Sequence, residues 1–285
     1  MLNFRTPSFA HTVTRSFVGA VVFTVFANSP AFAEPIDDLM GVMKFSAVIE
    51  VLVDEGRSMA DDTSDAELGV PRDVWDDMIA KLYNQTSITQ AFRDELVVAF
   101  GATDLSPIVS FYEKDLGREI VDLELKARKA ISDDAVLAAA SELWANLDPQ
   151  SQRAQLIEDY VVANDLIEMN IVGSMNSDIA YYRGFTAGAP DGMGLSDADI
   201  MREVWAGEPD ARAQVTEWVY GFSALAYQPL DEDEFDTYIA FGKSKAGRAL
   251  NSAMFAAFDT VYSDLARGLG AGTAMLMQTF DGQEL

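Results

Sequence analysis

Two acidic residues near the middle of the chain have the spacing that acid–base chemistry requires. Asp165 and Glu168 are three positions apart in the segment 150–182, which we expect to form one long helix, so their side chains share a helix face. Tyr181 and Tyr182 follow on the same segment. If these side chains point inward, they line a pocket in which paired carboxylates act as general acid and base. If they point outward, they form an ordinary solvated face, and the sequence leaves both interpretations open.

A second set of candidates lies in a pattern that the chain contains twice. The pattern is Phe, five residues and then Gly-Arg, and it begins at Phe111 and again, 130 positions later, at Phe241. We expect each copy to lie where a short helix ends and a longer one begins. The amides at a helix start and nearby basic side chains together bind carboxylate or phosphate groups. The candidates for such an anion site are Arg118, Arg248, Lys114 and Lys245.

The same arginines also have a purely structural interpretation. The full chain carries 46 acidic residues against 20 basic ones, so each arginine has many carboxylates of its own protein as partners. Arg118 and Arg248 then brace a helix corner, in which Gly117 and Gly247 allow close packing and the phenylalanines anchor the short helices. We favour this interpretation over an anion site.

The first 33 residues have the composition of a secretory signal. Arg5 and Arg15 lie in a start without acidic residues, an apolar run covers 17–26, and the segment ends in Ala-Phe-Ala at 31–33. These features predict export to the periplasm with cleavage before Glu34. The alternative is an uncleaved anchor helix, for which the apolar run is short, because a membrane span needs about 20 apolar residues. No later stretch is long and apolar enough, so we expect no transmembrane anchor in the mature chain.

Removal of the signal excludes several kinds of chemistry. The sequence has no cysteine, and its one histidine, His11, leaves with the signal. The mature chain therefore lacks the residues for Ser-His or Cys-His catalysis, zinc or haem ligation and thiol redox reactions, and we predict no cofactor and no metal site. The loss of Arg5 and Arg15 leaves 18 basic against 46 acidic residues, a net charge of −28. Such an acidic protein repels nucleic acid, and the charge fits either simple solubility or a partner with a basic surface.

Apolar residues recur at helical spacing along nearly the whole mature chain, which predicts an all-α protein. Two stretches rich in turn-forming residues, 61–70 and 187–194, are expected to be loops. The last helix is expected to run towards Phe280. Helix starts are predicted at or near Pro35, Pro71, Ser87, Asp104, Ser132, Gln150, Ser196, Pro209, Asp231 and Ala246.

The repeated pattern is part of a longer internal similarity. When the chain is shifted by 130 positions, eight identities occur in 49 aligned positions, where average composition gives about three. Trp75 then matches Trp205, and we expect both in the core. The similarity predicts a helical bundle built from two related units, 34–147 and 148–285, packed as one globular body.

The two copies, FYEKDLGRE and FGKSKAGRA, resemble a motif of exported bacterial proteins grouped as domain of unknown function 2059. In that family the motif runs roughly Phe-Tyr-x-Ser-Pro-x-Gly-Lys. Ser244 matches its serine, whereas Lys114 replaces that serine in the first copy, and Asp115 and Lys245 stand at the proline position. The resemblance implies a periplasmic helical protein and brings no catalytic residue.

Three hypotheses for the function follow from the sequence. The favoured one is a non-enzymatic protein that binds a partner protein or a small molecule in a groove between the two units. The alternative is a hydrolase or lyase of unusual type, in which Asp165 and Glu168 act as acid and base without His or Cys. The third is a purely structural or chaperone-like envelope protein that presents Met-rich apolar surface. A structure discriminates between the first two, because the enzyme needs facing carboxylates in a closed cavity and the binding protein needs an apolar groove.

Overall fold

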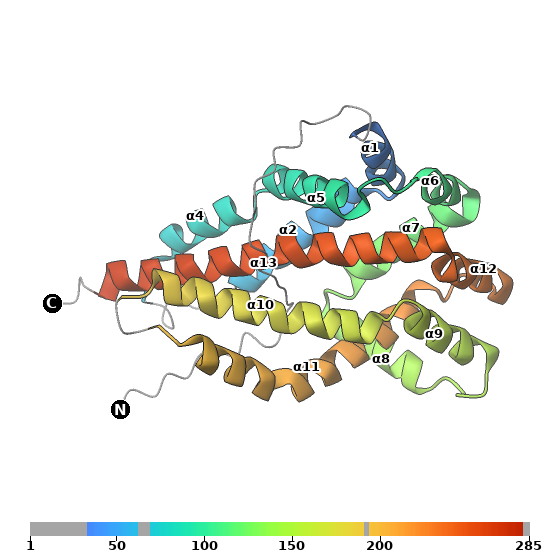
Figure 1. Ribbon diagram of the computed structural model, residues 1–285. Helices are drawn as coiled ribbons and strands as arrows, with labels where there is room; N and C mark the ends of the chain where they lie inside the picture. Colours follow the sequence, from blue (N-terminus) through green and yellow to red (C-terminus); the bar gives the residue numbers. More distant parts are fainter. Residues whose placement is uncertain (1–32, 62–68, 191–193, 282–285) are drawn as a thin grey trace.

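The computed structural model describes residues 33–61, 69–190 and 194–281, and these residues are almost entirely helical (Figure 1). The prediction of an all-α protein is confirmed, since the described ranges contain no strand. The predicted secretory signal lies outside the described residues except for Ala33, where the first helix begins. None of the helices in the described ranges has the length and apolar character needed to cross a membrane.

The N-terminal part of the chain forms short and medium-length helices on one side of the molecule (Figure 1). They are α1 (Ala33–Val42), α2 (Phe45–Asp61), α4 (Arg72–Leu82), α5 (Gln85–Phe100) and α6 (Ser106–Tyr112). The single helix predicted from Pro35 is in fact two, because Lys44 adopts a left-handed conformation (φ 52°) between α1 and α2. The helix predicted to begin at Ser87 begins earlier, since Asn84 caps α5 by accepting the Ser87 N–H at 3.0 Å.

The rest of the chain forms longer helices. They are α7 (Asp115–Ala130), α8 (Asp134–Ala145), α9 (Gln152–Ala163), α10 (Leu166–Gly188), α11 (Asp197–Ala226), α12 (Glu232–Lys243) and α13 (Lys245–Asp281). The predicted starts of α11 and α12 are confirmed, because Ser196 and Asp231 are their N-caps. The cap of α8 is Asp133 and not Ser132, since the Asp133 carboxylate accepts the Ala135 N–H at 2.8 Å.

The segment 150–182, predicted as one helix, is divided between α9 and α10. Asp165 has a left-handed backbone (φ 51°) that ends one helix and starts the next. The Asn164 side chain donates to the Tyr160 carbonyl at 2.9 Å, and such competition by an asparagine for the helix carbonyls favours a break. Beyond the break α10 continues to Gly188, so the first two residues of the loop predicted at 187–194 are helical.

The helix start predicted at Pro209 is wrong, because α11 runs through this residue as one 30-residue helix. Proline removes one helical hydrogen bond and often ends a helix. Pro209 is exposed, so the carbonyl that loses its amide partner can bond to water and the helix continues.

The two tryptophans paired by the internal similarity have different environments. Trp75 is 3% exposed in the core, as predicted. Trp205 is 61% exposed, so its predicted place in the core is wrong. The cause is the orientation of α11, which turns Ile200 and Val204 towards α10 and leaves the next residue on the outer side.

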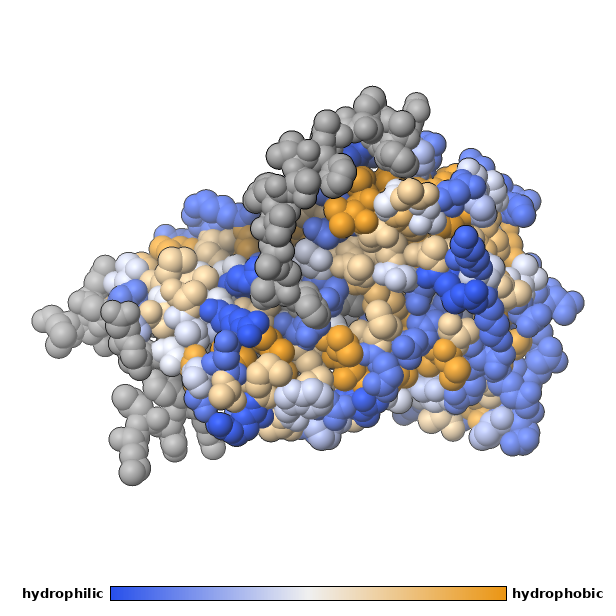
Figure 2. Space-filling view, viewed as in Figure 1, coloured by the Kyte–Doolittle hydropathy of each residue, from blue (hydrophilic) through white to orange (hydrophobic). Residues whose placement is uncertain are grey.

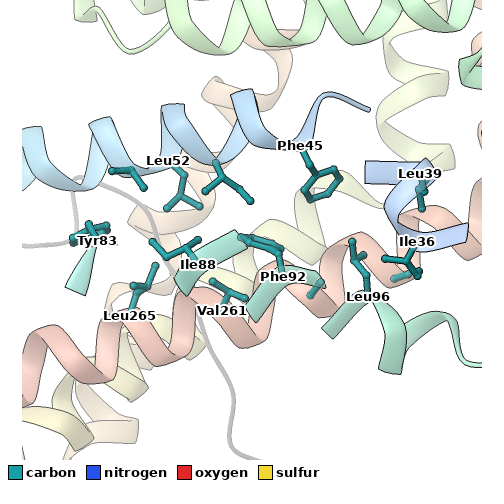
Figure 3. Packing of buried hydrophobic residues seen from close by; sticks show 14 of the residues in the cluster. Ile36, Leu39, Phe45, Leu52, Tyr83, Ile88, Phe92, Leu96, Val261 and Leu265 are labelled. Atoms are coloured by element: carbon teal, nitrogen blue, oxygen red, sulfur yellow. The ribbon is translucent and has the colours of Figure 1, made fainter. Parts of the chain in front are cut away.

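The longest helix, α13, runs through the middle of the molecule beside α10 (Figure 1). One core lies between α13 and the N-terminal helices, and side chains from α2, α5 and α13 meet in it around Phe92 (Figure 3). A second core joins α7, α9, α11 and α12. The two units predicted at 34–147 and 148–285 are therefore interleaved, since α13 completes the first core and α7 belongs to the second.

The repeated pattern forms two helix corners of the same design, the α6–α7 corner and the α12–α13 corner. In each, the residue directly before the second helix, Lys114 or Ser244, has an extended backbone. Glu113 and Lys114 separate α6 from α7, whereas Ser244 alone separates α12 from α13. An added Cβ at Gly117 would lie 2.3 Å, and one at Gly247 2.1 Å, from a carbonyl oxygen of the preceding helix. Both positions therefore require glycine, and the predicted role of these residues in close packing is confirmed.

The two corners meet through their phenylalanines. The rings of Phe111 and Phe241 stack with centroids 3.9 Å apart and an angle of 7° between their planes. Tyr112 meets Phe241 edge to face at 5.7 Å. A tandem duplication of one helical unit would account for the likeness of the two corners, and it stays a prediction.

Candidate functional site

Each corner arginine contacts groups of its own corner. Arg118 donates to the Glu113 carbonyl and forms an ion pair with Asp115, with 2.6 Å between Nη2 and Oδ1. Arg248 makes the equivalent backbone contact, to the Lys243 carbonyl. Both arginines are exposed. This geometry supports the bracing role over an anion site.

The other predicted charged candidates lie on the surface. Lys114 and Lys245 are exposed at the starts of α7 and α13, and Asp165 is exposed at the break before α10. Glu168 is exposed as well, and its two carboxylate oxygens accept from Arg212 at 2.5 and 3.0 Å. These hydrogen bonds lower the pKa of Glu168 below its ordinary value. The structure thus places the proposed acid–base pair on a solvated face, where one member is engaged in an ion pair.

Tyr181 and Tyr182 are half-buried on α10 and face different neighbours. Tyr181 packs against the first core, whereas Tyr182 packs against a small cluster of apolar residues between α10 and α11. Burial raises the pKa of Tyr181 to about 12. Both lie more than three helical turns beyond Glu168, or about 20 Å along the axis, so the structure does not unite them with the carboxylates.

A cavity of about 260 Å³ lies between α7, α11, the break that separates α9 from α10, and the α12–α13 corner. It is larger than the roughly 150 Å³ cavity that accepts benzene in a helical protein. Most of its wall is apolar, with a few polar groups that converge on the interior. Its aromatic side chains are Tyr112, Tyr160, Trp218, Phe222, Tyr238 and Phe241.

The polar centre of the cavity is the carboxyl group of Glu124, on α7. Its Oε1 accepts hydrogen bonds from the Tyr227 hydroxyl at 2.7 Å and from the Tyr238 hydroxyl at 2.8 Å. The Tyr227 hydroxyl also lies 2.7 Å from that of Tyr160. The carboxyl is thus held by α11, α12 and, through a second tyrosine, α9.

Burial sets the acidity of this group. Removal from water raises the pKa of Glu124, although the hydroxyl groups of Tyr227 and Tyr238 favour its ionised form. The same burial raises the pKa of Tyr112, Tyr160, Tyr227 and Tyr238 above the ordinary tyrosine value. The tyrosines therefore remain hydrogen-bond donors, and Glu124 keeps its proton to higher pH than in an unfolded chain.

Local structure explains the position of Tyr227. This residue caps the C-terminus of α11 and is 1% exposed. The turn that follows it is held by Arg153 on α9, which donates to the Tyr227 carbonyl at 3.3 Å and to the Leu230 carbonyl at 2.6 Å. The turn between α11 and α12 is thereby tied to α9, and its tyrosine points at Glu124.

Asparagines complete the end of the cavity formed by the break between α9 and α10. Asn251 on α13 donates to the Asn164 carbonyl at 3.0 Å, which ties the break to α13. The Asn164 side-chain oxygen lies opposite Gly242, where an added Cβ would come within 3.1 Å. The break, which the sequence pattern did not predict, therefore forms part of the cavity wall.

Sequence reasoning missed Glu124, because in the run DLELKARKA it resembles one of several charges on a solvated helix. The signal that could have identified it is its register. It lies four residues after Ile120 and three before Ala127, which are 0% and 5% exposed, so it shares their buried face.

No protein-family model, no curated protein and no solved structure matches this chain. The resemblance to domain of unknown function 2059 therefore stays a prediction that depends on the two short motifs. The structure itself defines an all-α protein with a carboxyl group in an aromatic-lined cavity.

Proposed function

We propose that this protein is an exported, periplasmic, non-enzymatic binding protein whose cavity at Glu124 holds a small ligand. The observation that carries the proposal is a carboxyl group directed into a mainly apolar cavity. Within the described residues, both hydrogen bonds to this carboxyl reach Oε1, so Oε2 is left for a molecule in the cavity. Ligand sites commonly combine an apolar wall with a few converging polar groups.

Binding is favoured over catalysis because the carboxylates proposed for acid–base chemistry lie elsewhere. Asp165 and Glu168 are exposed, and Glu168 is paired with Arg212. Glu124 stands in the cavity with tyrosines whose raised pKa values keep them protonated, so that they cannot accept a proton as general bases. A ligand held by hydrogen bonds fits this set of groups better than a hydrolase or lyase does.

The hypothesis of an envelope protein that presents Met-rich apolar surface has less support. The exposed large apolar residues in the described parts of the chain are scattered over several helices and the segment before α11, and Figure 2 shows apolar side chains interspersed with hydrophilic ones on the face in view. They are Val98, Val162, Val172, Leu195, Met201, Trp205 and Met275. Scattered single residues of this kind are ordinary on protein surfaces.

Native mass spectrometry of the exported protein tests the proposal. The full chain is expressed with its own signal and recovered from the periplasm of a bacterial host. We expect a polypeptide that begins at Glu34 and carries a small-molecule adduct. Ser223 lines the cavity and is 1% exposed, so Ser223→Leu fills the space and should remove the adduct.

Ser223→Ala is the matched control, because it removes the hydroxyl without filling the cavity. Its adduct should match that of the wild type, and circular dichroism should show that both variants are folded. An adduct of equal abundance in folded Ser223→Leu, or a wild-type protein without any adduct, would contradict the proposed site.

A further inference from the structure

We propose that the ligand is a small organic cation, such as a primary amine or a quaternary ammonium compound, with its charge beside Glu124 and its carbon groups against the aromatic wall. This inference rests on the proposed function and names the class of ligand for the same cavity. The steps that support it are the charge balance of the cavity, the nature of its wall and the field of the whole protein.

The first step is the charge balance. Among the described residues that line the cavity, Glu124 is the one with a charged form, and none is basic. The basic residue one turn further along α7 is Arg128, which pairs with Glu55 and lies over the Trp218 ring at 5.1 Å. Glu124 is partly exposed but lies among apolar and aromatic side chains. A carboxylate withdrawn from much of its water without a counter-ion is costly, so either a proton or a cationic ligand stabilises the group.

The second step is the aromatic wall. Five of the aromatic side chains come from α9, α11 and α12, and Asn164 at the break and Gly242 also line the cavity. The faces of aromatic rings attract cations, and aromatic side chains beside a carboxylate form the usual receptor for quaternary ammonium groups. The Arg128 guanidinium on Trp218 shows that one of these rings already accepts a cation.

The third step is the charge of the whole protein. The mature chain carries 18 basic against 46 acidic residues, so its field attracts cations and repels anions. An anionic ligand would also meet Glu124 without a basic partner in the cavity. A metal ion is disfavoured as well, because the described residues hold no group of three or more ligating side chains, whereas calcium takes about six to eight oxygen ligands.

Calorimetric titration with matched pairs of probes tests the class of ligand. The cations are choline and butylamine, and their neutral counterparts of similar shape are 3,3-dimethylbutan-1-ol and butan-1-ol. We expect at least one cation to bind the wild-type protein on the order of tenfold more tightly than its neutral counterpart. Glu124→Gln should weaken the cation on the order of tenfold and abolish the preference.

Glu119→Gln is the control, because it removes the same charge from an exposed position on the same helix. It should leave the affinity for the cations unchanged within about twofold, since exposed charges are screened by salt. Circular dichroism establishes that both variants are folded.

A pH titration of the wild type keeps the inference testable if Glu124→Gln does not fold. The charge of choline does not depend on pH, and the tyrosines that face Glu124 stay protonated because their pKa values are raised. The basic group near the cavity, Arg128, is paired with Glu55. Binding of choline should therefore weaken as the pH falls, because a proton on Glu124 competes with the ligand, while binding of the neutral alcohol should not.

The outcomes separate this inference from the proposed function. Equal affinity for cation and neutral counterpart, or tighter binding of choline at acidic pH, overturns the cation class. A native adduct without binding of either cation also overturns it, and the binding function then stands. If Ser223→Leu keeps the native adduct, the proposed site itself is wrong.

Discussion

The two helix corners share one backbone design, yet only the α12–α13 corner forms a substantial part of the cavity wall. That corner contributes Phe241, Gly242, Gly247 and Leu250, whereas the α6–α7 corner contributes Tyr112 alone. The residue after the phenylalanine explains the contrast. In the first corner it is Tyr112, 2% exposed, whose side chain occupies the space beside the backbone, and in the second it is Gly242, where the Asn164 side chain of the cavity wall takes that place. A repeated architecture therefore acquires a site where one side chain of the pattern is missing.

The largest expected loss of stability comes from alanine at the corner glycines, and it tests whether the two corners pack equally closely. Gly117→Ala and Gly247→Ala each place a Cβ against a carbonyl oxygen of the preceding helix, at 2.3 and 2.1 Å. Because backbone atoms cannot move aside as a flexible side chain can, each variant should lower the free energy of unfolding by about 3 kcal/mol. Urea denaturation followed by circular dichroism measures the change.

Gly207→Ala provides the control, since a Cβ added at this position on α11 has no described atom within 4 Å apart from its chain neighbours and the backbone of its own helix. Alanine is the better helix former, so this variant should be more stable by about 1 kcal/mol. If one corner tolerates alanine while the other does not, the two corners are not equivalent and the duplication loses its main structural support.

The next effect concerns the stacked phenylalanines, which join the corners. Phe111→Ala and Phe241→Ala should each cost about 2 to 3 kcal/mol, because both rings are partly buried and packed. A double-mutant cycle should give a coupling of about 1 kcal/mol for the stacked pair. Only Phe241 lines the cavity, so only Phe241→Ala should change ligand binding in the calorimetric titration. Equal effects of the two variants on ligand binding would contradict the conclusion that the α12–α13 corner forms the larger part of the cavity wall.

The corners were predictable from the sequence because their causes are local. Phe, Gly and Arg at fixed spacing determine where a helix stops, how closely the next one approaches and which carbonyl the arginine can reach. The helical class was predictable for the same reason, since a periodic apolar face such as Ile88, Phe92, Leu96 and Phe100 is visible within a single segment and is fully buried here.

The cavity was not predictable, because its parts come from distant segments whose packing no local pattern encodes. Glu124, Tyr160, Tyr227 and Tyr238 lie on four elements and meet only in the folded chain. The α9–α10 break at Asp165 depends on a left-handed residue that an apolar periodicity does not reveal. Spacing alone does not show whether a helix face is buried, so a candidate chosen by spacing, such as Glu168, lies on the surface of the folded protein.

A smaller effect distinguishes the corners at their helix starts. Ser244 accepts the Gly247 N–H at 3.0 Å, whereas Lys114 forms no side-chain cap with any described residue. Ser244→Ala should therefore cost about 1 kcal/mol, and Lys114→Ser should stabilise the first corner by a similar amount. Thermal unfolding measures all three variants, and Lys114→Ala is expected to change the stability little. A destabilised Lys114→Ser would show that the first corner depends on the lysine for a reason other than capping.

The smallest expected change in unfolding free energy at any one pH concerns Glu124, which connects the two corners. Its dependence on pH is the more informative measurement. It lies on α7, directly after the first corner, and accepts from Tyr238 on α12, directly before the second. Glutamine keeps the shape and an acceptor oxygen, so Glu124→Gln should change the unfolding free energy by only about 1 kcal/mol at acidic pH.

The pH dependence has a definite sign. Because the pKa of Glu124 is raised on folding, the folded protein holds this proton more tightly than the unfolded chain does. The resulting stabilisation is complete below the pKa of the unfolded chain and is lost as the pH rises through the pKa of the folded protein. Asp178, whose pKa burial raises to about 6, contributes a slope of the same sign in both proteins. The wild type should therefore lose more stability than Glu124→Gln as the pH rises, and a cation in the cavity should reduce that difference by replacing the proton. Identical slopes in the two proteins would mean that Glu124 titrates like a surface carboxyl, which would leave the second corner with an ordinary apolar cavity and no charged site.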